Sequence, residues 1–269
     1  LAAHGPGLAP RWLASHTLEI HGLPTKIAVR LMDADGAPSQ SEGNGSAKQE
    51  SRVAPMYVEQ LLRFTRESGE DPPAKLADLI ALRIERLPAE ARRVLQGVAV
   101  LGDAARSAQL VAMLPDVREL SRHMRDLEDG GFIAVDAGVV SSTHPLIRDV
   151  TLASTPAAVK ATLHGKARWD FGVDGAKAPL EADTHHAYYA GQSFEALMLL
   201  ERVADEARAR EDLDGVIAAM HRALELARRE MVRGEIDDPV NAMLMFSVKL
   251  GDALAQAGSV SFVIAALSA

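Results

Sequence analysis

The chain has 269 residues, a formal net charge of −8 at pH 7, and 48% hydrophobic and 25% charged residues. This acidic balance argues against a dedicated nucleic-acid binder, because that task needs a basic surface. The chain has no cysteine and no apolar run near the roughly 18 residues of a membrane span, so we expect a cytoplasmic protein without disulfides, thiolate metal sites or membrane contact.

The N-terminal part of the chain has little regular pattern. Residues 16–22 alternate polar and apolar side chains, which predicts one short strand. Residues 25–32 can begin a helix, but the Gly-, Ser- and Asp-containing stretch 33–51 predicts a loop. The chain starts at Leu1 instead of a methionine, and residues 260–269 are almost wholly apolar, so we expect a piece of a longer protein.

Helical patterns dominate the next part of the chain. Apolar side chains recur there at the three- and four-residue spacing of amphipathic helices. Pro88 separates two of these patterns, and Gly130-Gly131 supplies a C-terminal stop after the last one. The helices predicted from this spacing cover residues 55–67, 76–87, 91–101, 107–114 and 116–129.

A β-hairpin is predicted after these helices. Residues 132–135 and 139–142 have strand character, and Asp136-Ala137-Gly138 joins them as a turn. Thr143 is expected to cap a following helix, in which the early Pro145 is tolerated because the first helical N–H groups have no partner. Three helices, a hairpin and a further helix follow one another in the order of a winged helix.

The chain is again helical from residue 180 to the end. Breaks are expected at Ala190-Gly191, Asp214-Gly215 and Ala257-Gly258, and alanines recur where helices would touch. The pattern indicates tetratricopeptide-like helical repeats, although the spacing is irregular. The expected fold class is therefore mostly α, with a winged helix (helical bundle plus β-hairpin) followed by tetratricopeptide-like repeats.

Several strings of residues occur in the order found in a known protein family. Residues 54–62, Ala-Pro-Met-Tyr-Val-Glu-Gln-Leu-Leu, are similar to the Gly-Asn-Pro-Leu-Phe-Val-Glu-Glu-Leu-Leu string of STAND-type ATPase regions in bacterial signalling proteins. Residues 142–150, Ser-Thr-His-Pro-Leu-Ile-Arg-Asp-Val, resemble their Arg-His-Pro-Leu-Ile-Arg-Asp-Val string. Residues 76–102 look like the helix pair that opens their winged helix. The tail resembles kinase-linked members at residues 185–191, 222–230 and 234–239.

The resemblance implies an order of domains along the chain. It also implies that the parent protein is linked to a serine/threonine kinase, with cyclase-linked and LuxR-type regulators as other members of the family. The implied segments are the remnant of an AAA+ core end and loop (1–52), a lid helix (53–72), a winged-helix domain (73–155), a linker (156–179) and a truncated helical-repeat region (180–269).

The resemblance also implies a cofactor and partners. In that family ATP or ADP lies between the AAA+ core and the lid plus winged helix, and by position the contacts fall on Pro55 and His144. This chain has Val53-Ala54 where the family has Gly-Asn before the lid proline. The implied partners are an upstream nucleotide-binding domain and a protein that binds the repeats.

We expect no catalytic residue within this chain. The sequence has no Gly-x-x-x-x-Gly-Lys-[Ser/Thr] loop, and Gly165-Lys166 is followed by Ala167, so the backbone cradle for phosphates is missing. There is no kinase catalytic loop and no Gly-x-Ser-x-Gly elbow either. His185 and His186 are neighbours that point to different faces of a helix, so we expect no metal there.

Two sets of residues have alternative interpretations. His144 is either a donor to a nucleotide phosphate or a helix-start residue that bonds a nearby backbone carbonyl. Arg118, Arg122 and Arg125 would share one face of a helix placed to read DNA, but five acidic residues lie on the same helix. Intramolecular docking or a solvated face is therefore favoured over DNA binding. A stand-alone helical scaffold is the remaining alternative.

Overall fold

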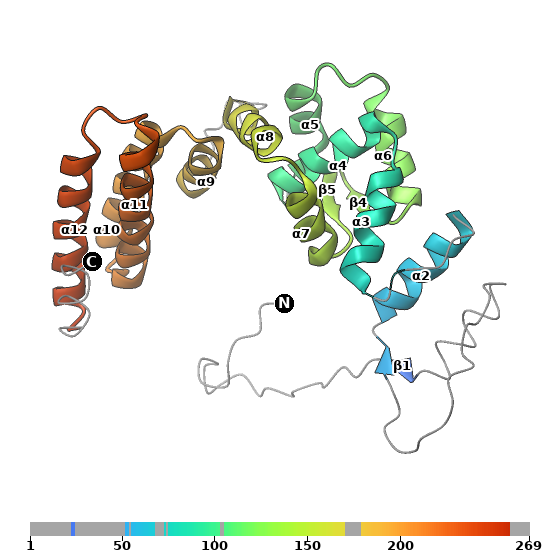
Figure 1. The fold of residues 1–269 in the computed structure, drawn as a ribbon, viewed down its shortest axis with the longest axis horizontal. Helices are drawn as coiled ribbons and strands as arrows, with labels where there is room; N and C mark the ends of the chain where they lie inside the picture. The colour runs from blue at the N-terminus through green and yellow to red at the C-terminus, as the bar shows by residue number, and fades with distance from the viewer. Residues whose placement is uncertain are drawn as a thin grey trace. The chain divides into compact units, whose positions relative to one another are not determined.

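Helices make up most of the structure. The computed structural model describes residues 23–24, 52–53, 55–67, 73, 75–102, 105–169 and 179–258. These residues contain eleven helices and five short strands, so the expectation of a mostly helical chain is confirmed (Figure 1). The strand predicted over 16–22 and the helix predicted over 25–32 lie outside the described residues. None of the described helices is both long and apolar enough to cross a bilayer.

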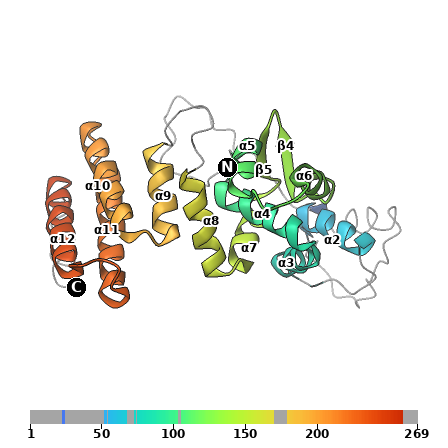
Figure 2. The same ribbon diagram turned by 90° about the horizontal axis from the view of Figure 1, so that it is seen from above.

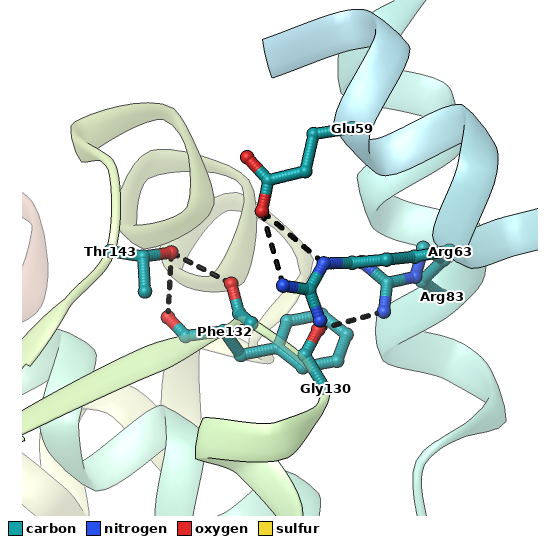
Figure 3. Close-up of polar contacts among 7 residues, drawn as sticks. Glu59, Arg63, Arg83, Gly130, Phe132 and Thr143 are labelled. Carbon is teal, nitrogen blue, oxygen red and sulfur yellow. Dashed lines mark hydrogen bonds and ion pairs between the residues drawn. The ribbon is translucent and has the colours of Figure 1, made fainter. Parts of the chain in front are cut away.

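The chain divides into two compact units, residues 1–80 and 81–269. In the first unit β1 (Leu23–Pro24) pairs antiparallel with β2 (Arg52–Val53). The helix predicted over 55–67 is confirmed as α2 (Pro55–Glu67), whose buried face is formed by Val58, Gln60, Leu61 and Phe64. Arg63 donates to Glu59 one turn away at 3.2 Å (Figure 3). The boundary of the units falls within α3 (Leu76–Arg86).

In the second unit α4 (Ala89–Leu101) forms the centre of the first core. It packs against α5 (Ser107–Met113), α6 (Leu120–Asp129), α7 (Pro145–Ser154) and α8 (Ala157–Trp169). A Cβ added to Gly97 would lie 2.8 Å from Met113 Cε, so the glycine allows α5 to approach closely. The helices predicted over 76–87, 91–101 and 107–114 are confirmed as α3, α4 and α5.

A three-stranded antiparallel sheet completes this core. Its central strand is β5 (Val139–Ser142), flanked by β3 (Ala105–Arg106) and β4 (Ile133–Asp136). The β4–β5 hairpin lies beside α6 (Figure 2). Its turn residues Ala137 and Gly138 have φ values of 49° and 81°, which match the twist of a tight hairpin. The predicted hairpin is confirmed, with the turn one residue shorter than expected.

Arg83 is the largest of the fully buried side chains described in the second unit. Only 1% of its surface is exposed. Its Nη2 donates to the Gly130 carbonyl at 2.9 Å, and its guanidinium lies 4.6 Å from the centre of the Phe132 ring (Figure 3). The cation is therefore buried with a hydrogen bond and an aromatic face, which offset part of the cost of removing it from water.

The helix predicted over 116–129 begins only at Leu120, so that prediction was wrong at its start. Glu119 has φ 52° and ψ 39°, a left-handed backbone that interrupts a right-handed helix. Residues 115–119 form turns instead. Arg118 therefore lies before α6, and only Arg122 and Arg125 lie on it.

The cap of α7 also differs from the prediction. Nδ1 of His144 accepts the N–H of Leu146 at 3.1 Å, so His144 is the cap, and Pro145 begins the helix. Thr143 lies one residue earlier and is tied to the preceding turn. Its hydroxyl donates to the Gly131 carbonyl at 2.7 Å, and a second bond leads to Phe132 (Figure 3).

Four helices form the second core of this unit. They are α9 (Leu180–Ala190), α10 (Ser193–Ala209), α11 (Leu213–Arg233) and α12 (Pro239–Gln256). Each packs against the next, and α10, α11 and α12 lie side by side in both views (Figures 1 and 2). The interior consists of alanine, leucine and a few larger apolar side chains. The breaks predicted at Ala190-Gly191 and Ala257-Gly258 are confirmed.

Two further differences concern connections between helices. The break predicted at Asp214-Gly215 was wrong, because both residues lie in the first turn of α11 and the chain turns over residues 210–212. Asp212 begins that helix by accepting the N–H of Gly215 at 2.9 Å. Residues 157–169, which fall in the predicted linker, form α8. Its buried side chains include Leu163, Ala167 and a histidine, an apolar pattern too weak to predict a helix.

Candidate functional site

A cleft of about 740 Å³ lies in the second unit, where the first and second cores meet. Its walls come from α4, α7, α8, α9, α11 and the residue Glu235 that follows α11. The cationic side chains that line it are Arg148, Lys160, Arg229 and Arg233, and Glu235 is the carboxylate among the lining residues. We refer to this feature as the cationic cleft.

Two buried histidines lie at the wall between α8 and α9. Nδ1 of His164 is 2.9 Å from Nδ1 of His186, so one of the two nitrogens must carry a proton and donate to the other. Burial, and then the charges of His186 and His185, lower the pKa of His164 to about 3. Burial, and then the charge of His185, lower the pKa of His186 to about 4. Both side chains are therefore neutral at pH 7.

Aromatic rings form another part of the wall. The Tyr189 ring stacks on His164, with centroids 5.2 Å apart and planes 28° apart, and lies 4.7 Å from the His185 ring. Burial, and then the charge of Arg148, lower the pKa of His185. Within the described residues, no group of three or more His, Asp or Glu side chains is placed to hold a metal ion. The site thus offers cations and aromatic faces.

A buried carboxylate positions one of the arginines. Glu230 is fully buried, and its Oε1 accepts the Ser193 hydroxyl at 2.7 Å while its Oε2 accepts the Glu235 N–H at 3.2 Å. Nε of Arg229 lies 3.8 Å from the same carboxylate, and the Arg229 guanidinium lies 5.1 Å from the centre of the Tyr188 ring. Arg229 is therefore held at the cleft by an ion pair and an aromatic face.

The other fixed cation is Arg148. Its Nε donates to the carbonyl of Ala99 on α4 at 3.0 Å, which anchors the side chain across the first core. Gly102, with φ 86°, lets the backbone pass the guanidinium closely, because a Cβ there would lie 3.3 Å from Nη2. The string over residues 142–150 did not predict this bond to the backbone.

The two residues expected to contact a nucleotide are each exposed. Pro55 is the first residue of α2 in the first unit. His144 belongs to the second unit, and its Nδ1 is used in capping α7, which leaves Nε2 as its other polar atom. His144 therefore does bond the backbone through one ring nitrogen, but its partner is an N–H group and not a carbonyl.

The three arginines proposed as a DNA or docking face are also exposed, but they do not act alike. Arg122 pairs with Glu119 at 3.0 Å, and this bond and the charges of Glu119 and Asp126 raise the pKa of Arg122. Nε of Arg125 donates to the Ser121 carbonyl at 3.4 Å. Arg118 lies in the turn before α6. Arg122 and Arg125 therefore already contact neighbouring residues of their own segment.

A second surface feature is an apolar groove of about 280 Å³ between α10 and α12. Phe194 and Met198 of α10 line it and are 62% and 50% exposed. Acidic side chains lie along it: Glu201, Asp237 and Asp238. We call this feature the α10–α12 groove. A protein surface of this kind suits an apolar side chain of a partner.

Sequence reasoning missed most of the cationic cleft. His164 and Lys160 fell in a predicted linker, and no binding role was assigned to Arg229 or Arg233. The resemblance to STAND-type ATPase regions rests on the strings of residues alone. No protein family matches the chain, and comparisons with curated proteins and with solved structures give no match. The order of the elements, the cationic cleft and the α10–α12 groove are therefore what the structure offers for assigning a function.

Proposed function

We propose that the chain is a regulatory and interaction segment of an ATP-dependent signal-transduction protein linked to a serine/threonine kinase. Residues 73–155 would act as a winged helix that contacts an upstream nucleotide-binding domain. The repeats after residue 180 would receive a protein partner. ATP or ADP is the cofactor of the parent protein in this proposal, and Pro55 and His144 are its contacts.

The observation that carries the proposal is the order of elements in the first core of the second unit. Helix, strand, two helices and two strands follow one another as α4, β3, α5, α6, β4 and β5. The strands form one antiparallel sheet in the order β3-β5-β4. This order supports a winged helix, because the short first strand pairs with the second strand of the wing.

The second core supports the interaction part of the proposal. Helices α9 to α12 pack in sequence through small residues such as Ala196, Ala204 and Ala223, as in arrays of helical repeats. Such arrays use their surfaces for partners. The α10–α12 groove, with Phe194 and Met198 exposed, is the apolar surface that fits this role.

The first test is to read the coding sequence upstream of the codon for Leu1. The proposal requires a nucleotide-binding loop of the form Gly-x-x-x-x-Gly-Lys-[Ser/Thr] there, followed by an AAA+ core. A kinase catalytic loop further upstream would support the kinase-linked type. A start codon close by, with neither motif, would leave the helical scaffold as the better description.

The second test separates the two roles of His144 in the protein that includes the nucleotide domain. His144→Asp keeps a residue that caps helices well, but it places a negative charge where the phosphate is proposed. We expect it to lower ADP retention by at least about tenfold while leaving the melting temperature almost unchanged. His221→Asp, at an exposed position of α11, is the matched control. Equal ADP retention in both variants would remove the phosphate contact.

DNA binding is the alternative function, and one observation favours it. Arg122 and Arg125 are exposed on α6, the helix that directly precedes the wing-like hairpin. Titration of labelled duplex DNA at low salt tests it, because phosphate contacts weaken as salt rises. Salt-sensitive binding that is lost in Arg122→Gln/Arg125→Gln would favour a DNA-binding regulator over the signalling segment.

A further inference from the structure

The cationic cleft has the opposite charge to the chain as a whole. Four cationic side chains line it against one carboxylate, whereas the whole chain has a net charge of −8. The four come from α7, α8 and α11, so the fold, and not a single basic stretch of sequence, brings them together. Cations gathered around one cleft repel one another, and an anion placed among them relieves that repulsion.

The four cations fall into two kinds. Arg148 and Arg229 are fixed, the first by the Ala99 carbonyl and the second by Glu230 and the Tyr188 ring. Lys160 and Arg233 have no ion pair or side-chain hydrogen bond within the part of the chain that is described. Fixed guanidinium groups orient a ligand, and unpaired cations add charge without breaking an existing contact.

The buried polar atoms of Arg229 add an independent observation. Nε and Nη2 of its guanidinium are buried and have no hydrogen-bond acceptor among the described residues. The Glu230 carboxylate near them is 3.8 Å from Nε, beyond hydrogen-bond length. The Arg229 side chain as a whole is 35% exposed, so the cost of these unsatisfied donors falls on the two buried nitrogens, and an oxyanion supplies acceptors of the required charge.

The positive potential of the cleft also reaches its histidines. The charges of Lys160 and Arg148 contribute, after burial and the other histidines, to the lowered pKa of His164. Arg148 contributes in the same way to the lowered pKa of His185. A neighbouring positive charge disfavours a second positive charge, so the field that adds to the effect of burial on these pKa values also favours an anion in the cleft.

We propose that the cationic cleft binds a small phosphate-bearing anion, held by Arg148, Lys160, Arg229 and Arg233. A volume of about 740 Å³ is that of a small-molecule site. Guanidinium groups match the oxygens of a phosphate in pairs, and the ring of Tyr189 offers an aromatic face to the rest of the ligand. His144 is not among the residues that line the cleft, so this site is separate from its proposed nucleotide contact.

The test uses inorganic pyrophosphate as the probe and titration calorimetry on the full chain in about 150 mM NaCl, near physiological ionic strength. We expect saturable binding with one site per chain. The double variant Lys160→Gln/Arg233→Gln should weaken it by at least tenfold, because two unpaired cations are lost. Arg228→Gln removes one cation at an exposed position of α11 and is the matched control for Arg233→Gln alone. It should leave the affinity within a factor of two.

Three results would overturn the proposal. They are no saturable binding of pyrophosphate, an equal loss of affinity in Arg228→Gln, or tighter binding of a tetraglutamate peptide, which would make the cleft a site for acidic protein segments. Arg233 is exposed, so Arg233→Gln alone serves if the double variant has a lower melting temperature. That single variant must still bind pyrophosphate more weakly than Arg228→Gln does.

Discussion

At the scale of single residues, the pair formed by His164 and His186 makes stability depend on pH. The two Nδ1 atoms share one proton at 2.9 Å, and this contact requires that at least one ring stays neutral. Protonation of the second nitrogen would remove the acceptor, set two N–H groups against each other and place a positive charge in a buried wall. The folded state therefore binds fewer protons than the unfolded chain over the range in which an exposed histidine titrates.

The pair predicts a loss of stability in mild acid. The pKa values of His164 and His186 fall from their ordinary value of 6.5 to about 3 and about 4 on folding. For a pKa that folding lowers, the stabilisation is complete above pH 6.5 and declines as pH falls towards the folded value. We expect the free energy of unfolding to decrease between pH 7 and pH 5, measured by urea titration at each pH.

His164→Gln tests the origin of that decline. The amide does not titrate, so the slope of stability against pH between 6.5 and 4 should fall by up to about 1.4 kcal/mol per pH unit. His221→Gln removes an exposed histidine and should leave the slope unchanged. Parallel pH curves for the wild type and His164→Gln would mean that the decline arises from carboxylates instead.

Arg83 gives a second prediction at this scale. Arg83→Ala removes a buried cation, its bond to the Gly130 carbonyl and its contact with the Phe132 ring. We expect the free energy of unfolding to drop by about 2–4 kcal/mol, measured by urea denaturation. Arg86→Ala changes an exposed position of the same helix and should cost under about 1 kcal/mol. Similar costs at the two positions would contradict a structural role for Arg83.

At the scale of elements, the contact of α4 with α5 depends on a missing side chain. Gly97→Val should lower stability by about 1–3 kcal/mol, because the branched side chain meets Met113, Leu110 and Leu114. Gly97→Ala should be nearly neutral, since helix propensity gains up to about 1 kcal/mol and the end of Met113 can move. Urea midpoints of the purified variants measure both.

Gly251 in α12 is the matched control for this prediction. A Cβ there meets nothing within 4 Å, so Gly251→Ala should raise stability by about 0.5–1 kcal/mol through propensity alone. A stabilisation of similar size for Gly97→Val would show that α5 does not need the space at Gly97.

Elements with a strong apolar stripe were predictable from the sequence. α2 and α4 were found because their buried side chains recur at helical spacing. α8 was missed because alanine and a buried histidine stand where larger apolar residues would mark the stripe. The start of α6 was misplaced because Glu119 adopts a left-handed backbone that its residue type does not predict. The strand β3 has two residues, too few to show the alternation of polar and apolar side chains that predicts a strand.

The candidate site was less predictable than the fold. Its lining residues come mainly from five helices, and no single stretch of sequence contains them together. His185 was considered as a metal ligand and rejected, and Arg148 was noted only as part of the string over residues 142–150. The pairing of His164 with His186 joins residues 22 positions apart on different helices, so only the packing of α8 on α9 reveals it.

At the scale of the whole molecule, the second unit has its own interior. The first core surrounds α4 and the second is the cluster of α9 to α12, both within residues 81–269. We expect residues 75–269, which keep α3 whole, to fold without the preceding segment. Circular dichroism should show a helical spectrum and a cooperative melt. A non-cooperative melt would mean that the first unit is needed for folding.

The connection between α11 and α12 lines both the cationic cleft and the α10–α12 groove. Glu235 lines the cationic cleft, and the next three residues, Ile236, Asp237 and Asp238, line the α10–α12 groove. The buried Glu230 fastens this connection through the N–H of Glu235. A ligand that shifts Glu235 therefore also shifts the wall of the groove. Coupling between two binding sites is reciprocal. If a partner in the groove raises the affinity of the cleft for its ligand, the ligand must raise the affinity of the groove for the partner by the same factor.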